Sequence, residues 1–139
     1  MTFTKIITIS GKPGLFEILS QTKNSVIVKS LIEGKRFPIT ATHNVSLLEN
    51  IAIYTYDEEI PLATIFKNIA DKEQGKKAIS HKESNKNVTN YFLEVLPNYD
   101  QERVYPSNIK KIIQWYNILV NADFDFSTLT LEVSTEEEE

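Results

Sequence analysis

Residues 14–56, GLFEILSQTKNSVIVKSLIEGKRFPITATHNVSLLENIAIYTY, carry four short apolar runs separated by polar breaks. The runs cover residues 15–19, 26–28, 36–39 and 51–56. Short runs that are rich in β-branched and aromatic residues and bounded by turn residues are typical of β-strands. Because the runs follow one another at regular spacing, the stretch predicts a barrel or a small sandwich.

The third run shows how such a strand would be buried. Phe37 and Ile39 alternate with polar positions, so one face of the run is apolar, as in a half-buried strand. Pro38 has no N–H to donate to a neighbouring strand, which places this run at an edge or a bend of the sheet. A polar corner, continued by one helical turn through residues 47–48, leads to the last run.

Residues 4–10 fit two patterns. The apolar spacing from Phe3 to Ile7 fits one face of a helix, whereas the β-branched isoleucines at 6, 7 and 9 suit a strand. We favour a short helix that ends at Gly11, because glycine is a common helix stop.

Three later segments have helical periodicity, with Pro61 expected at the first helical position of one and Ser107 as the N-cap of another. The polar stretch 75–87 between the first two is expected to be a mobile loop. Three amphipathic helices of this length can bury their apolar stripes on one another. The stripes are Leu62, Ile65, Phe66, Ile69 and Ala70; Val88, Tyr91, Phe92, Val95 and Leu96; and Ile109, Ile112, Ile113, Tyr116, Leu119 and Val120.

Charge is distributed unevenly along the chain. Residues 1–121 contain all 15 lysine and arginine residues and 12 of the 19 acidic residues, a net charge of +3. Residues 122–139 contain the other seven acids and no base, and they end in four glutamates. We expect this segment to be a disordered acidic tail that either keeps the protein soluble or competes with nucleic acid for the positive body.

Catalytic and metal-binding patterns were not found. The chain has no cysteine, and neither of its histidines, His43 and His81, has a second metal-type ligand at helical spacing. The sequence contains no nucleophile motif and no glycine-rich dinucleotide loop. We therefore expect a non-catalytic protein without metal or cofactor.

One candidate binding surface is aromatic and cationic. Tyr54 and Tyr56 share one face of the last predicted strand, and the same segment has an excess of basic residues, among them Lys12, Lys35 and Arg36. Aromatic rings can stack on bases while cations contact phosphates. These five residues predict binding of RNA, or of single-stranded DNA.

A second candidate surface lies on the last helix. At 100° per residue, Trp115 and Ile118 point away from the main apolar stripe, on the same side as Lys111. Large apolar side chains usually find a core, so these residues either dock the helices on the barrel or close a dimer. The alternative is an exposed patch that binds a protein partner.

Five strings follow one another along the chain: SGKPGLFEIL (10–19), GKRFP (34–38), ATH (41–43), IAIYT (51–55) and ERVYPSNIKKIIQWYNIL (102–119). Together they resemble an uncharacterised family of Bacteroidota proteins known as a domain of unknown function. The resemblance covers residues 4–120 and implies a bacterial protein, but no activity or site residues. We also expect a soluble, cytoplasmic protein, because no apolar stretch is long enough for a signal peptide or a membrane span.

The predicted fold class is α+β. Residues 1–57 are expected to form a small barrel with a short N-terminal helix, similar to SH3-like, Sm-like and Tudor barrels. Residues 60–121 are expected to form a helical domain, and residues 122–139 the disordered tail. Barrels of this kind share no chemistry, so the predicted function is a non-catalytic binding module for nucleic acid, with a protein-interaction adaptor as the alternative.

Overall fold

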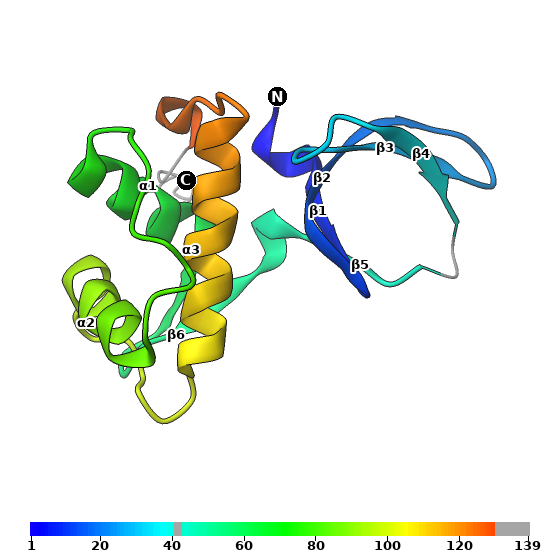
Figure 1. The fold of residues 1–139 in the computed structure, drawn as a ribbon. Helices are drawn as coiled ribbons and strands as arrows, with labels where there is room; N and C mark the ends of the chain where they lie inside the picture. The colour runs from blue at the N-terminus through cyan, green and yellow to red at the C-terminus, as the bar shows by residue number, and fades with distance from the viewer. Residues whose placement is uncertain (41–42, 130–139) are drawn as a thin grey trace, which may run out of the picture.

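The computed structural model describes residues 1–40 and 43–129 of the 139-residue chain. A five-stranded antiparallel sheet comes first, a two-stranded sheet follows, and three α-helices complete the described part (Figure 1). The predicted α+β class, with strands before helices, is confirmed.

The five-stranded sheet has the order β4-β3-β2-β1-β5, so the first strand lies between the second and the last. All four pairings are antiparallel. Within the described residues β4 and β5 do not pair with each other, and the sheet is therefore open rather than a closed barrel. The strands are β1 (Ile6–Ile9), β2 (Lys12–Gln21), β3 (Val26–Ser30), β4 (Arg36–Ile39) and β5 (Val45–Leu47).

The prediction of an N-terminal helix over residues 4–10 is wrong. Only Phe3–Lys5 form a single 3-10 turn, η1, and β1 begins at Ile6. Strand β1 pairs with β2 on one side and β5 on the other, and Ile6 faces one side of the sheet whereas Ile7 and Ile9 face the other. Pairing on both edges therefore outweighs the helical spacing that Phe3 to Ile7 show.

The last predicted strand does not join this sheet. Strand β6 (Ala52–Tyr54) pairs with β7 (Glu59–Pro61) in a hairpin of its own, with Tyr54 opposite Glu59. Asp57 and Glu58, at the boundary between the predicted barrel and the predicted helical domain, lie in the turn of this hairpin, and Glu59 begins β7. The buried hydroxyl of Thr55 closes that turn by accepting hydrogen bonds from the N–H groups of Asp57 and Glu58, at 3.2 and 2.9 Å.

The three predicted helices are present as α1 (Leu62–Glu73), α2 (Asn85–Val95) and α3 (Pro106–Asn121). Helices α1 and α3 begin one or two positions away from their predicted starts. Pro61 is the N-cap of α1 rather than its first residue, and α3 begins at Pro106 after Tyr105. Proline suits the first helical position because its missing N–H would have no partner there.

Side chains of α3 hold the loop between α1 and α2. Asn117 accepts a hydrogen bond from the N–H of Ala78 at 2.8 Å and donates one to the carbonyl of Ile79 at 3.0 Å. The buried hydroxyl of Tyr116 donates to the carbonyl of Lys76 at 2.7 Å. The loop expected to be mobile is thus tied to a buried helix.

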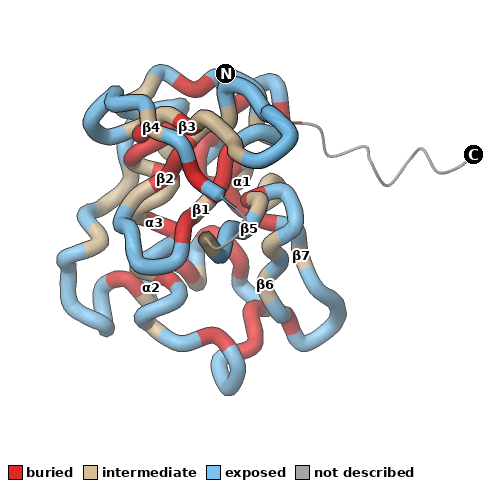
Figure 2. The backbone as a smooth tube through the Cα atoms, turned by 90° about the vertical axis from the view of Figure 1, so that its right-hand side faces the viewer, coloured by how far each residue is buried: buried red, intermediate tan, exposed pale blue. Residues whose placement is uncertain are grey.

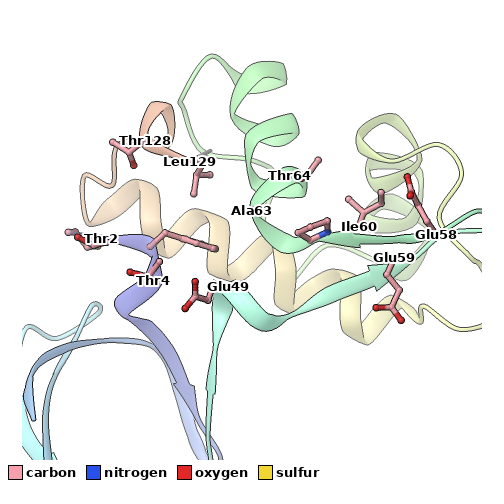
Figure 3. A pocket seen from close by; sticks show the side chains of 13 residues that line it. Thr2, Thr4, Glu49, Glu58, Glu59, Ile60, Ala63, Thr64, Thr128 and Leu129 are labelled. Carbon is pink, nitrogen blue, oxygen red and sulfur yellow. The ribbon is translucent and has the colours of Figure 1, made fainter. Parts of the chain in front are cut away.

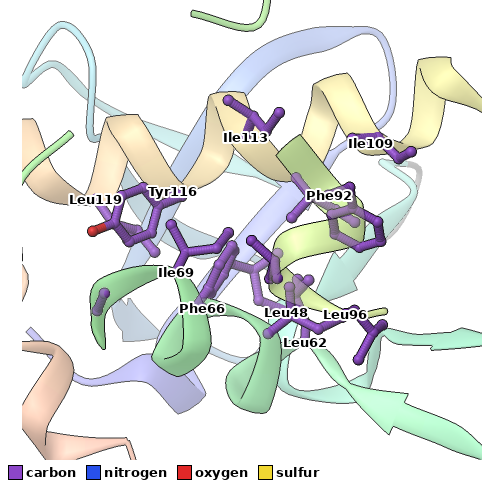
Figure 4. Close-up of a cluster of buried hydrophobic side chains, with 14 of the residues drawn as sticks. Leu48, Leu62, Phe66, Ile69, Phe92, Leu96, Ile109, Ile113, Tyr116 and Leu119 are labelled. Atoms are coloured by element: carbon purple, nitrogen blue, oxygen red, sulfur yellow. The ribbon is translucent and has the colours of Figure 1, made fainter. Parts of the chain in front are cut away.

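The large hydrophobic cluster lies between the helices and one face of the five-stranded sheet (Figure 4). It includes Phe66 from α1, Phe92 from α2 and Tyr116 from α3, together with Ile6 and Leu15 from the sheet. Figure 2 shows that buried segments from both halves of the chain come together where sheet and helices meet. Residues 1–57 and 60–121 thus share one core.

The small hydrophobic cluster consists of sheet residues alone. Ile7, Ile9, Phe16, Val28 and Ile39 are at most 4% exposed, although no helix belongs to this cluster. The sheet must therefore curl so that its strands cover one another, as the ribbon shows (Figure 1).

The chain after α3 returns to the large cluster. Phe124, Phe126 and Leu129 are buried there, and the ring of Phe126 stacks on that of Tyr116 with 4.9 Å between centroids. The prediction of a disordered tail is wrong for residues 122–129, where a 3-10 turn, η3 (Phe126–Thr128), forms. The four terminal glutamates lie outside the described residues.

Candidate binding cleft

A cleft of about 800 Å³ lies between the N-terminal turn, the β6–β7 hairpin and the first turn of α1 (Figure 3). Its lining is mainly apolar and includes Phe3, Ile60 and Leu129. The lining residues are Met1, Thr2, Phe3, Thr4, Glu49, Glu58, Glu59, Ile60, Pro61, Ala63, Thr64, Thr128 and Leu129.

Three carboxylates stand around this cleft. Glu49 comes from the 3-10 turn η2 (Leu48–Asn50) and lies beside Thr4, whereas Glu58 and Glu59 lie beyond Ile60 at the other end (Figure 3). All three glutamates are exposed. The lining has no lysine, arginine or histidine side chain, so the cleft combines apolar surface with negative charge.

An arginine from the loop before α3 stacks on a tyrosine of the hairpin. The guanidinium of Arg103 lies 4.3 Å from the ring centroid of Tyr54, and its Nε donates a 2.8 Å hydrogen bond to Asp100. The Asp100 side chain is 9% exposed and also accepts from the N–H of Glu102 at 2.9 Å. The hydrogen bond from Arg103 is the main cause that lowers the pKa of Asp100, and this pair fixes the loop before α3.

The five residues predicted to bind nucleic acid do not form one surface. Tyr54 and Tyr56 lie on or just after β6, in the two-stranded sheet, whereas the three cations lie on β2 and β4 or between β3 and β4. One face of the Tyr54 ring is covered by Arg103, and the Tyr56 hydroxyl accepts a hydrogen bond from the N–H of Gln101 at 3.1 Å.

The three predicted cations are themselves divided between the two faces of the sheet. Lys12 Nζ lies 5.3 Å from the ring centroid of Phe37, which packs against the small cluster. Arg36 alternates with Phe37 along β4 and therefore points to the other face, where it lies opposite Lys29. Lys35 lies just before this strand and is exposed.

The predicted protein-binding stripe on α3 is also divided. Ile118 is buried, and its Cδ1 lies 4.0 Å from the position a Cβ on Gly14 would take, so this side chain docks α3 on β2. Trp115 is partly buried against the large cluster, and Lys111 is exposed. Of the interpretations given for these residues, the position of Ile118 agrees with docking of the helices on the sheet. An exposed stripe that includes Ile118 is excluded by its burial.

Neither metal-binding nor membrane-spanning features appear in residues 1–40 and 43–129. No group of three or more histidine, aspartate or glutamate side chains there is arranged to hold a metal ion. None of the helices in the same residues has the length and apolarity needed to cross a bilayer. His43 Nδ1 accepts a 3.1 Å hydrogen bond from the N–H of Thr40, as a residue that shapes a turn would.

Sequence reasoning missed the cleft because its walls come from four separate segments, around residues 1–4, 49, 58–64 and 128–129. One signal was present. The acidic run 57–59 stands next to the apolar Ile60 and Pro61, in a short segment flanked by two longer apolar patterns. The run lies at the boundary between the predicted barrel (1–57) and the predicted helical domain (60–121), so no strand was expected there.

Two family models match the chain. The domain of unknown function DUF5606 matches residues 3–48, and the domain of unknown function DUF6852 matches residues 51–119. A solution NMR structure of a Bacteroides vulgatus protein, from a structural genomics consortium, is 44% identical, covers 89% of each chain and has a TM-score of 0.73. No curated protein matches.

Proposed function

This chain belongs to an uncharacterised family of Bacteroidota proteins and matches the models of two domains of unknown function, and from that premise we propose that it is a non-catalytic protein-interaction module. The observation that carries the proposal is the cleft beside β7. Its mainly apolar lining suits an apolar side chain of a partner polypeptide, and its exposed polar groups suit the solvated backbone around that side chain.

The lining supports binding rather than catalysis. Its ionisable side chains are three exposed glutamates, whereas catalytic acids and bases are usually tuned by burial or by a close charged partner. Neither histidine lies in the lining. A cleft with apolar surface and an open rim fits reversible association.

A cleft-filling substitution tests the proposal. Peptides would be selected from a random displayed library on the full chain, and their affinity for an Ala63→Phe variant would then be measured. Because Ala63 lines the cleft, we expect the larger side chain to weaken binding by tenfold or more. The matched control is Ala52→Phe, at an exposed position of β6 outside the cleft. Equal affinity for both variants would contradict the proposal.

Nucleic-acid binding is a second candidate, favoured by the cations near the β4 edge. Lys35 and Arg36 are exposed there, and Lys12 reaches over Phe37. The strand order, with β1 between β2 and the last strand, is similar to that of SH3-like and Sm-like barrels, some of which bind RNA. This similarity supports the candidate by analogy of architecture.

Salt dependence and charge removal test this second candidate. Labelled single-stranded RNA should bind the full chain less tightly as salt rises. The double variant Lys35→Gln with Arg36→Gln should reduce the slope of log affinity against log salt concentration by about 1.4, about 0.7 for each lost phosphate contact. The control removes two exposed lysines elsewhere, Lys82→Gln with Lys86→Gln. If the salt dependence of RNA binding is the same for both double variants, the β4 edge is not the binding site.

A further inference from the structure

The charge of the cleft indicates which polypeptide fits it, an inference that rests on the proposed function. Apart from the amino group of Met1, the charged groups of the lining are the carboxylates of Glu49, Glu58 and Glu59. None of them takes part in an ion pair within the described part of the chain. Glu59 does act on Arg103, whose pKa is raised mainly by Asp100 and to a lesser degree by Glu59. Arg103 is thus already committed to Asp100.

The backbone of β7 favours an extended segment over a small cation. The N–H of Thr55 donates to the carbonyl of Glu58, and the N–H of Leu62 donates to that of Ile51. Hydrogen-bonded pairs alternate along an antiparallel ladder, so Glu59 stands in a non-hydrogen-bonded pair with Tyr54. Its N–H and C=O therefore point away from β6.

The opposite edge of the same hairpin shows that this geometry accepts a neighbouring strand. The carbonyl of Tyr54 also points outward, and it accepts a 2.9 Å hydrogen bond from the N–H of Asp100. Residues Thr55 and Tyr99 form an antiparallel bridge there. Glu58 and the three residues of β7 that follow it all line the cleft, although their side chains alternate between faces. The cleft thus follows that edge.

We propose that the partner is a cationic, extended polypeptide segment that places an apolar side chain in the cleft and pairs its backbone with Glu59. Lysine or arginine side chains on either side of the apolar one would then meet the three glutamates. Pro61 has no N–H, so the pairing is confined to a short bridge, and specificity comes from the side chains.

Charge complementarity favours this cationic segment over two other possible occupants of the cleft, nucleic acid and the chain's own residues 130–139. Nucleic acid would bring its phosphates against three carboxylates, which is unfavourable. The chain's own residues 130–139 carry five further glutamates, at 132 and 136–139, and would add like charge to the same rim. A basic partner would instead be attracted by the three carboxylates.

Titration of the full ¹⁵N-labelled chain with four capped nonapeptides tests the inference. The first has a central leucine flanked by lysine and arginine, the second has glutamine in place of every cation, the third has glutamate, and the fourth has glycine in place of leucine. We expect the first to shift the amides of Glu59, Ala63 and Thr64, with an affinity at least about tenfold above that of the second. The third should not bind.

Two charge variants locate the interaction. Glu58→Gln with Glu59→Gln should remove the preference for the cationic peptide, whereas Glu33→Gln with Glu83→Gln, at exposed positions outside the cleft, should keep it. If the glutamine peptide binds as tightly as the cationic one, the cationic partner is wrong but a protein-binding cleft stands. If the glycine peptide binds equally and Ala63→Phe has no effect, both proposals fail. Binding by none of the peptides also overturns the inference.

A shortened chain tests whether residues 130–139 themselves occupy the cleft. Residues 1–129 keep the whole described lining of the cleft and lack the five glutamates that follow. An affinity equal to or lower than that of the full chain is expected, because those glutamates can only add attraction for a cation. If the peptide binds only the shortened chain, residues 130–139 occupy the cleft in the full chain. That result would overturn the proposal of an external partner.

Discussion

The two hydrophobic clusters are built from the same strands but depend on different parts of the chain. Leu15 and Phe16 are neighbours on β2, yet Leu15 packs with the helices in the large cluster and Phe16 packs within the curled sheet. The same division separates Ile6 from Ile7 on β1. Alternation along a strand therefore gives one sheet two cores.

This difference teaches that the two halves of the chain are not equivalent as folding units. The small cluster closes without any residue after Leu47, whereas the large cluster needs residues from Ile6 to Leu129. The helices and the C-terminal segment thus depend on the sheet for part of their core. The predictions below test how far each cluster stands alone, beginning with the largest effect.

Removal of residues 122–139 should break the large cluster. A chain that ends at Asn121 loses the buried side chains of Phe124, Phe126 and Leu129, which should cost about 4–8 kcal/mol of unfolding free energy. That is comparable with the whole stability of many domains. Urea denaturation followed by the fluorescence of Trp115, the one tryptophan of the chain, measures the loss.

The control is a chain that ends at Leu129 and keeps these three side chains. We expect its unfolding free energy to stay within about 1 kcal/mol of that of the full chain, since it loses none of the described burial. If both shortened chains are equally stable, the aromatic residues after α3 add nothing, and the expectation of a tail from residue 122 would be restored.

Val28→Ala should weaken the small cluster with less effect on the helices. Val28 is fully buried on β3 between β2 and β4, so the loss of two methyl groups should cost about 1–2 kcal/mol. Amide hydrogen exchange should quicken most in β3 and β4, and least in α3. The matched control is Val45→Ala on β5, where the side chain is 46% exposed. An equal rise in exchange across α3 would show that the two clusters unfold as one.

The sequence predicted the elements that local pattern decides. All three helices lie where their apolar spacing placed them, and β2, β3 and β4 follow the runs at 15–19, 26–28 and 36–39. Each of these elements buries one face against a continuous neighbour, so periodicity and burial agree. The errors fall where distant segments decide the structure.

Two examples show why those segments could not be predicted. Residues 6–9 are short enough to fit either pattern, and only their pairing with both β2 and β5 makes them a strand. Residues 51–56 read as one more strand of the meander, but the turn at Thr55 pairs them with 59–61 instead. The cleft depends on both outcomes, because η1 and β7 form two of its walls. Pairing partners are tertiary information that a single sequence gives only weakly.

Alkaline pH should affect the large cluster selectively, because the small cluster has no ionisable side chain among its described members. Burial is the main cause that raises the pKa of Tyr116 to about 12, with a smaller contribution from Glu73, against about 10 for an unfolded tyrosine. The fold thus favours the neutral phenol, and its contribution to stability is complete below pH 10 and is lost as pH rises to 12. Tyr91, whose pKa is also raised by burial and by its hydrogen bond to Glu73, acts in the same direction.

Tyr116→Phe isolates this contribution. The variant loses the hydrogen bond to the carbonyl of Lys76, so its unfolding free energy at pH 8 should fall by about 1 kcal/mol. Between pH 10 and 12 its stability should decline less steeply than that of the parent chain, because one proton fewer is released on unfolding. Tyr105→Phe, at an exposed N-cap position of α3, serves as the control and should keep the parent's slope. An unchanged slope for Tyr116→Phe would mean that the alkaline loss arises outside the ring that α3 places at the centre of the large cluster.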